Sequence, residues 1–176
     1  MSQTTKPDAS SIITNLANAP EERYDEGPWG STTRVLTPHM RERGGKLGVV
    51  MNTLKQGQVG CPFHHHLLED EVFYVVSGRG VLRYGDTLAE LVPGDCVSCP
   101  AGTGIAHQIA NPYEEDLVYL AMGPYEKNEV CAYPDNGKVF VRGLRQVGFL
   151  SPAEYMAGEP DPPVIFALAS ASAVKI

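Results

Sequence analysis

Short runs of apolar residues, many of them alternating with polar ones, follow one another along the chain from about residue 32. The runs are separated by residues typical of turns, such as Gly44-Gly45, Pro93-Gly94 and Asn136-Gly137. Side chains of an extended strand alternate between two faces, so runs of this length and spacing predict strands. The predicted strands are 32–37, 46–54, 71–77, 80–84, 88–92, 96–99, 105–110, 117–122, 129–133 and 138–142.

Many short strands with little helical periodicity predict an all-β sandwich or barrel. One short helix is expected before them, capped by Ser10 or Ser11 and ending near Asn18, because Ile12, Ile13 and Leu16 form an apolar side. A chain of 176 residues is long enough for one domain with a substantial core. We expect an N-terminal extension over 1–30, the β domain over 31–145 and a proline-containing arm over 146–176 that lies over the barrel.

The strand predicted at 71–77 is apolar on both faces. Glu71, Phe73 and Val75 form one set, and the opposite set of Val72, Tyr74 and Val76 is apolar as well. A sheet that is wet on one side alternates apolar with polar residues, so something is expected to cover the second face. A second sheet layer, the terminal segments or another subunit would do so, and we expect a homodimer. Tyr74 and Tyr119 are interpreted as packing or interface residues on that outer face.

Composition and charge exclude several classes of partner. The net charge of −7 leaves no basic surface for nucleic acid or an anionic membrane. The opening residues 1–7 are polar and lack the apolar core of an export signal. The apolar run from Val164 to Val174 contains serines and is shorter than the roughly 20 residues of a membrane-spanning helix. A cytoplasmic protein is therefore expected.

Candidate chemistry is concentrated in two stretches, His64-x-His66-x4-Glu71 and the segment around His107. In a strand His64 and His66 point to one face while His65 points to the other. Glu71 lies an odd number of residues beyond His66, so a turn or bulge within 67–70 must reset the phase. Three imidazoles and one carboxylate suit one divalent transition metal, with Fe, Mn, Ni, Zn and Cu all compatible.

Other polar residues are given structural roles. His65, His39 and the pair Glu69-Asp70 are interpreted as polar residues exposed at the surface. The four cysteines are interpreted as buried free thiols, because Cys96-x2-Cys99 lacks the second pair that a structural zinc site needs. Cys61 lies three residues before His64 and is expected near the mouth of a pocket.

These two stretches resemble the two conserved motifs of the cupin family. His64-x-His66-x4-Glu71-x6-Gly78 matches the first motif, although its leading glycine is out of register. Gly94-x5-Pro100-x-Gly102 and Gly104-x2-His107-x3-Asn111 match the two halves of the second, separated by two extra residues. The motif regions are 57–78 and 94–111, and the resemblance covers roughly residues 46 to 125. It implies a single-domain cupin, a jelly-roll-like double-stranded β-helix barrel, with a metal on His64, His66, Glu71 and His107.

The resemblance also implies classes of function. A metal-dependent enzyme of the isomerase, lyase or dioxygenase type would act on a small carbonyl, hydroxy-acid or sugar-like metabolite. A non-catalytic cupin that binds or senses a small molecule such as a sugar is the alternative, and a purely structural metal is a third. Glu71 is also a candidate base if it leaves the metal. Arg83, Arg34 and Tyr84 are the candidate substrate-binding residues.

Overall fold

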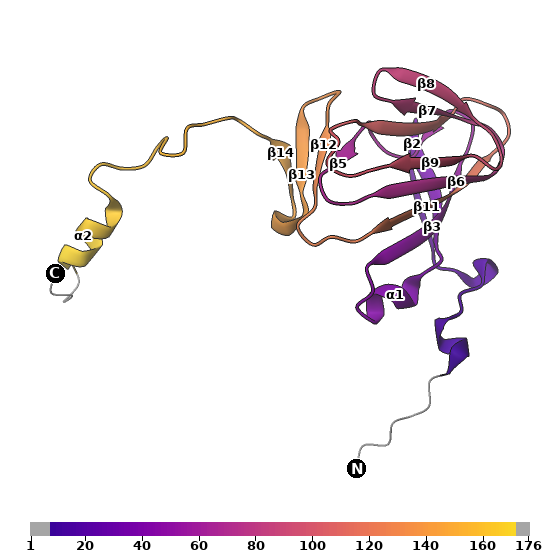
Figure 1. Cartoon of the computed structure of the whole chain (residues 1–176), viewed down its shortest axis with the longest axis horizontal. Helices are drawn as coiled ribbons and strands as arrows, with labels where there is room; N and C mark the ends of the chain where they lie inside the picture. The colour runs from indigo at the N-terminus through magenta and orange to yellow at the C-terminus, as the bar shows by residue number, and fades with distance from the viewer. Residues whose placement is uncertain (1–7, 172–176) are drawn as a thin grey trace, which may run out of the picture.

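The computed structural model describes residues 8–171, so the polar opening segment 1–7 and the last residues of the apolar run to Val174 lie outside the described residues. Two twisted sheets make up the body, and the C-terminal segment extends away from them (Figure 1). The prediction of an all-β fold is confirmed. The strands are β1 Glu21–Glu26, β2 Trp29–Val35, β3 Leu47–Leu54, β4 Gln58–Val59, β5 His65–His66, β6 Glu71–Ser77, β7 Gly80–Tyr84, β8 Thr87–Leu91, β9 Cys96–Cys99, β10 His107–Asn111, β11 Leu117–Pro124, β12 Val130–Tyr133, β13 Lys138–Val141 and β14 Gln146–Phe149.

The larger sheet has ten strands in the order β8-β7-β10-β4-β2-β3-β11-β6-β9, with β1 paired to β2 outside this path. It curls so that its two ends face each other (Figure 1). The smaller sheet has the order β14-β13-β12-β5. Because β5 belongs to this second sheet while β6 belongs to the first, the segment between them carries the chain from one sheet to the other.

All the predicted strands are present, with ends displaced by at most three residues. Strands β1, β4, β5 and β14 were not expected. In β1 all six residues are exposed and most are charged, so no apolar alternation marks it, and it forms by pairing with β2 across a turn at Gly27. Strands β4 and β5 have two residues each, too few for any period to be read from sequence.

Helices are short. Two 3-10 helices, Ala9–Ile12 and Leu16–Asn18, replace the single helix expected near Ser10, because Asp8 and Asn15 each cap a separate turn. Helix α1 spans Pro38–Glu42, a 3-10 turn covers Arg142–Leu144, and α2 spans Val164–Ala171. Across residues 8–171, no helix combines the length and the apolar character needed to cross a membrane.

The hydrophobic core fills the inside of the curled sheet. Alternate residues of β6 point inward, since Phe73 and Val75 are buried while Tyr74 and Val76 are exposed. The core consists of Leu54, Phe73, Val75, Leu82, Leu91, Cys99, Ile109, Leu117 and Tyr119. The expectation that Tyr119 packs on the outer face is wrong, because a bulge between Val118 and Tyr119 changes the pairing of β11 with β6 and the ring is buried.

The sequence suggested that the C-terminal arm lies over the barrel, and this expectation is wrong. After β14 pairs with β13, residues 150–163 run outward and end in α2, which stands clear of both sheets (Figure 1). No residue of α2 is buried. The prolines at 152, 160, 162 and 163 lack the N–H that strand pairing requires, which is a physical reason for the extended path.

Candidate metal centre

His64 and His107 lie opposite each other on paired backbone. The N–H of His64 donates to the carbonyl of His107 at 3.1 Å, and the N–H of His107 donates back to the carbonyl of His64 at 2.8 Å. Directly opposed residues of an antiparallel pair project to the same face. Both side chains therefore point inward, and their ring centroids are 4.5 Å apart.

His66 and Glu71 reach the same place from β5 and the start of β6. Bends at Leu67 and Leu68 lie between them, as the phase argument required. The Nε2 atoms of all three histidines are close to one oxygen of Glu71. Glu71 Oε2 is 2.8 Å from His107 Nε2, 3.2 Å from His66 Nε2 and 3.7 Å from His64 Nε2.

This convergence alters the proton affinity of the groups. Burial by itself would raise the pKa of Glu71, but the nearby imidazoles of His107, His64 and His66 outweigh burial and hold the pKa well below its ordinary value. Burial opposes protonation of His64, yet contacts with Cys61 and Glu71 raise its pKa. A carboxylate that stays ionised among three imidazoles is the electrostatic environment that a divalent cation requires.

One further observation supports metal binding by these four residues. Both ring nitrogens of His66 are buried and have no hydrogen-bond partner among the described residues. A buried polar atom without a partner costs free energy, which coordination of a cation by Nε2 would recover. His64, Glu71 and His107 place one ligand atom each within 4.8 Å of one another.

Other donors lie around this set. His64, His66 and Cys131 form a second group of close ligand atoms, and Cys61 Sγ is 3.6 Å from His64 Nδ1. Cys61 is exposed, whereas Cys131 is buried on β12 directly opposite His66. Sequence spacing gave no signal for Cys131, because only the pairing of β12 with β5 brings it to the histidines.

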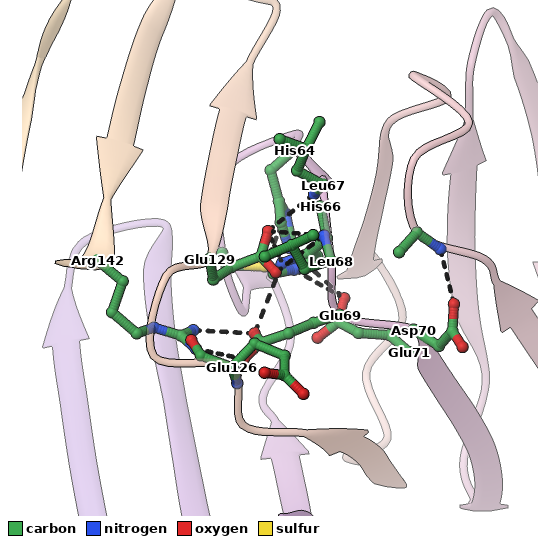
Figure 2. Close-up of polar contacts among 12 residues, drawn as sticks. His64, His66, Leu67, Leu68, Glu69, Asp70, Glu71, Glu126, Glu129 and Arg142 are labelled. Atoms are coloured by element: carbon green, nitrogen blue, oxygen red, sulfur yellow. Dashed lines mark hydrogen bonds and ion pairs between the residues drawn. The ribbon is translucent and has the colours of Figure 1, made fainter.

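Glu69 is not a surface charge, and that interpretation is wrong. Its side chain is 7 % exposed and forms a bidentate ion pair with Arg142, whose Nη2 donates to Glu69 Oε2 at 2.9 Å (Figure 2). The N–H of Glu126 also donates to Glu69 Oε1 at 2.6 Å. The bends at 67–68 turn Glu69 inward, and the partner comes from a segment more than seventy residues away.

Asp70, by contrast, is exposed and anchors the loop that precedes His107. Its Oδ1 accepts from the N–H of Ala101 at 2.8 Å, and the N–H of Gly102 donates to the carbonyl of His66 at 2.9 Å. Gly102 and Gly104 both have positive φ. The two extra residues of this loop are thereby accommodated as a turn held against the segment that carries the histidines.

A pocket of about 490 Å³ opens beside the cluster. Glu71 lies on its wall, together with Glu69 and Arg142, while β3 and β11 supply apolar residues such as Val49 and Met122. Of the four candidate ligands, Glu71 is the one that borders this pocket. A small molecule in the pocket would therefore meet the cluster at Glu71.

None of the three residues expected to bind substrate is among the residues that line this pocket. Arg83 donates to Asp135 at 2.8 Å and stacks over Phe63, with its guanidinium 3.5 Å from the ring centroid. Arg34 bonds Glu21 and the carbonyl of Leu16, while its neighbours on β2, Thr33 and Val35, line the pocket. Tyr84 packs against the core.

The two histidines expected to be exposed at the surface, His65 and His39, have defined surroundings. His65 is half-buried on β5, with its Nδ1 enclosed and without a hydrogen-bond partner in the described part of the chain. His39 lies on α1, where its Nδ1 is 3.1 Å from Glu42.

Comparison with known proteins agrees with this architecture. Residues 50–123 match the family model described as a cupin domain. None of the curated proteins matches the sequence significantly.

Solved structures share the fold at low identity. A protein from Acidithiobacillus ferrooxidans, provisionally named a sugar phosphate isomerase, has a TM-score of 0.72 and 22% identity, covering 84% of this chain and 100% of its own. A cupin superfamily sugar phosphate isomerase from Silicibacter pomeroyi has a TM-score of 0.65 and 23% identity, covering 80% and 96%. A Thermotoga maritima protein named as a predicted oxalate decarboxylase has a TM-score of 0.56 and 20% identity, covering 65% and 100%. At these identities the likeness establishes the fold and leaves the chemistry open.

Proposed function

Because the chain carries a cupin domain, we propose that it is a metal-dependent enzyme acting on a small carbonyl, hydroxy-acid or sugar-like metabolite. His64, His66, Glu71 and His107 would hold one divalent transition metal ion. One observation carries the proposal. Three imidazole Nε2 atoms surround a single oxygen of Glu71 at 2.8, 3.2 and 3.7 Å, and that carboxylate borders a pocket of about 490 Å³.

Such a metal, when bound, polarises a carbonyl or hydroxyl oxygen of the substrate and stabilises the negative charge that develops there. The chain's own residues supply the rest. Glu71 borders the pocket, so once released from the metal its carboxylate would accept a proton from a substrate carbon or hydroxyl. Apolar pocket residues, including Val49, Ala121 and Met122, limit the access of water to that transfer.

Within this class, isomerisation of a sugar phosphate is the reaction to test first. Two structural neighbours carry that name, although their identity to this chain supports fold only. Thr33, Thr37, Lys46 and Arg142 are among the residues that line the pocket. Lys46 is an exposed rim residue paired with Glu126 at 2.7 Å, and surface pairs of this kind are worth about 0–1 kcal/mol. A phosphate can therefore replace Glu126 at little cost.

The test is turnover by protein reconstituted separately with Mn(II), Zn(II), Ni(II) and Fe(II). Interconversion of an aldose phosphate and a ketose phosphate without oxygen is the expected result. Oxygen uptake with the Fe(II) form would instead identify a dioxygenase. A rise in melting temperature with added sugars but no consumption of any of them would overturn the enzyme proposal and favour the non-catalytic sugar-binding alternative.

We also propose that the protein acts as a homodimer in which the arm of one copy covers the outer face of the other. That face exposes Tyr74 and Val76, at 41% and 42%. The arm and the strand before it expose large apolar side chains, namely Phe149, Leu150, Tyr155, Met156, Val164, Ile165, Phe166 and Leu168. At roughly 100 Å² each, their burial would supply about the 800 Å² per partner of a standard interface.

A further inference from the structure

Behind His66, on the side away from Glu71, lies a cluster of charged side chains that the sequence did not reveal. Glu129 immediately precedes β12 and is 0% exposed, and Glu69 and Arg142 lie next to it (Figure 2). His66 Nδ1 is 3.6 Å from Glu129 Oε1 and 3.8 Å from Glu69 Oε2. The imidazole of His66 is therefore situated between two sets of carboxylates, with Glu71 facing Nε2 and this cluster facing Nδ1.

The cluster is not itself a cation site, although His66, Glu69 and Glu129 have close ligand atoms. The guanidinium of Arg142 already lies where a metal ion bound to Glu69 would lie. Both of its terminal nitrogens donate to Glu69, and Nη1 also donates to the carbonyl of Glu126 at 2.8 Å. A bidentate guanidinium satisfies both oxygens of a carboxylate and its charge.

Glu129 has a different set of partners. Its carboxylate accepts hydrogen bonds from the N–H of Leu67 at 2.8 Å and of Leu68 at 3.1 Å. Within residues 8–171, its one ion-pair contact is with His66. Two carboxylates and one arginine leave one negative charge in a fully enclosed place, and a buried charge needs a polar partner. The nearby ring nitrogen of His66 has no other hydrogen-bond partner in that part of the chain.

We infer that Glu129 is the positioning residue of the metal centre: its buried carboxylate faces Nδ1 of His66 at 3.6 Å, favours a proton there and leaves the lone pair of Nε2 for a metal ion. Which ring nitrogen of a histidine carries the proton is set by the partner of the other nitrogen, and such carboxylate partners orient metal-binding histidines. By holding the N–H groups of Leu67 and Leu68, the same carboxylate also fixes the bend that returns the chain to Glu71. This inference depends on the proposed metal function for its purpose, but not for its geometry.

The test compares the wild type with Glu129→Gln, using Zn(II) and Ni(II) as probes in calorimetric titration. A glutamine oxygen still accepts from the N–H groups of Leu67 and Leu68 but places no negative charge beside His66. We expect the dissociation constant to rise about 10- to 100-fold. The melting temperature of the metal-free protein should change little. Glu115→Gln, at an exposed glutamate paired with Arg79, is the matched control and should leave the constant unchanged.

A second measurement does not require metal. In metal-free Glu71→Ala, which removes the carboxylate 3.2 Å from Nε2, nitrogen-15 NMR of His66 should show the proton on Nδ1, and adding Glu129→Gln should mix the two tautomers. A proton on Nε2 in Glu71→Ala would overturn the inference, as would an unchanged metal affinity in Glu129→Gln. If the wild type bound neither metal, the proposed function would fail while the NMR result still decided the role of Glu129. If Glu129→Gln failed to fold, the tautomer in Glu71→Ala alone would decide it.

Discussion

At the scale of single residues, the alternation of side chains along a strand is the strongest constraint on the candidate site. His64 and His66 share a face, and His65 lies between them on the other face with a half-buried ring. Neighbouring histidines of the same chemistry therefore have different surroundings. Only a residue's position in the pleat distinguishes them.

Replacing these histidines one at a time tests that distinction. We expect His66→Ala to weaken Zn(II) binding by more than about 100-fold, since it removes a ligand and not merely a ligand's partner. His65→Ala should retain the metal, with at most a modest loss of stability. Elemental analysis and calorimetric titration of both variants give the answer, and equal metal content would contradict the alternation argument.

The four cysteines should also differ in reactivity, because their burial and the pKa of their thiols differ. Burial and the charge of Glu71 raise the pKa of Cys99 to about 11, and burial raises that of Cys131. A raised pKa lowers the thiolate fraction at a given pH, so at pH 8 only roughly a thousandth of Cys99 is thiolate. Cys61 and Cys96 are exposed, so the interpretation of all four thiols as buried is wrong for these two.

We therefore expect an aromatic disulfide reagent to modify Cys61 and Cys96 within minutes at pH 8, while Cys99 and Cys131 react only after unfolding in urea. The rate for Cys99 should rise as the pH approaches 11. Rapid modification of all four thiols in the native protein would show that the core around β9 opens readily.

At the scale of elements, the turn after β6 depends on one glycine. Gly78 has φ +74, and a Cβ there would overlap the carbonyl oxygen of Asp116. Gly57 has nearly the same φ, +76, but a Cβ there meets no atom within 4 Å. The two positions share the backbone strain of a left-handed residue and differ in the space for a side chain.

Alanine at each position separates these effects. Gly57→Ala should lose about 1–2 kcal/mol from the free energy of unfolding, the cost of left-handed backbone alone. We expect Gly78→Ala to lose at least about 2 kcal/mol more, because backbone must move to admit the methyl group. Urea unfolding of both variants measures this. Equal losses of unfolding free energy would show that the backbone at Asp116 moves aside at little cost.

At the scale of the whole molecule, the apolar surface left by a single chain is the feature to explain. The outer face of β6 and the arm beyond β14 both expose large apolar side chains. Exposed apolar patches of this extent mark interaction surfaces. Since the arm carries acidic residues and no basic one over 150–171, a second copy of the chain fits it better than an anionic membrane.

Deleting residues 150–176 tests the arm directly. We expect the full chain to have twice the monomer mass in light scattering at micromolar concentration, and the truncated chain to have the monomer mass. Circular dichroism of the truncated protein should retain the β spectrum, because the deletion begins after β14. A monomeric full chain would contradict the dimer.

The sequence alone determined the all-β class, most strand positions and the residues His64, His66, Glu71 and His107 as candidates. These depend on local patterns: side-chain period, turn residues and spacing along one short stretch. Tertiary structure alone brought Glu129, Arg142 and Cys131 to the segment that carries the histidines and Glu69. Their partners lie sixty or more residues away, so nothing in the local pattern distinguishes Glu129 or Glu69 from a surface glutamate.

Strands β1 and β5 likewise form because a neighbouring strand offers hydrogen bonds, not because their own residues alternate. The outward course of the arm also could not be read from its composition. Apolar residues need cover, but composition does not say whether their own chain or another copy provides it. Periodicity is a property of a segment, whereas pairing and burial are properties of what lies beside that segment in space.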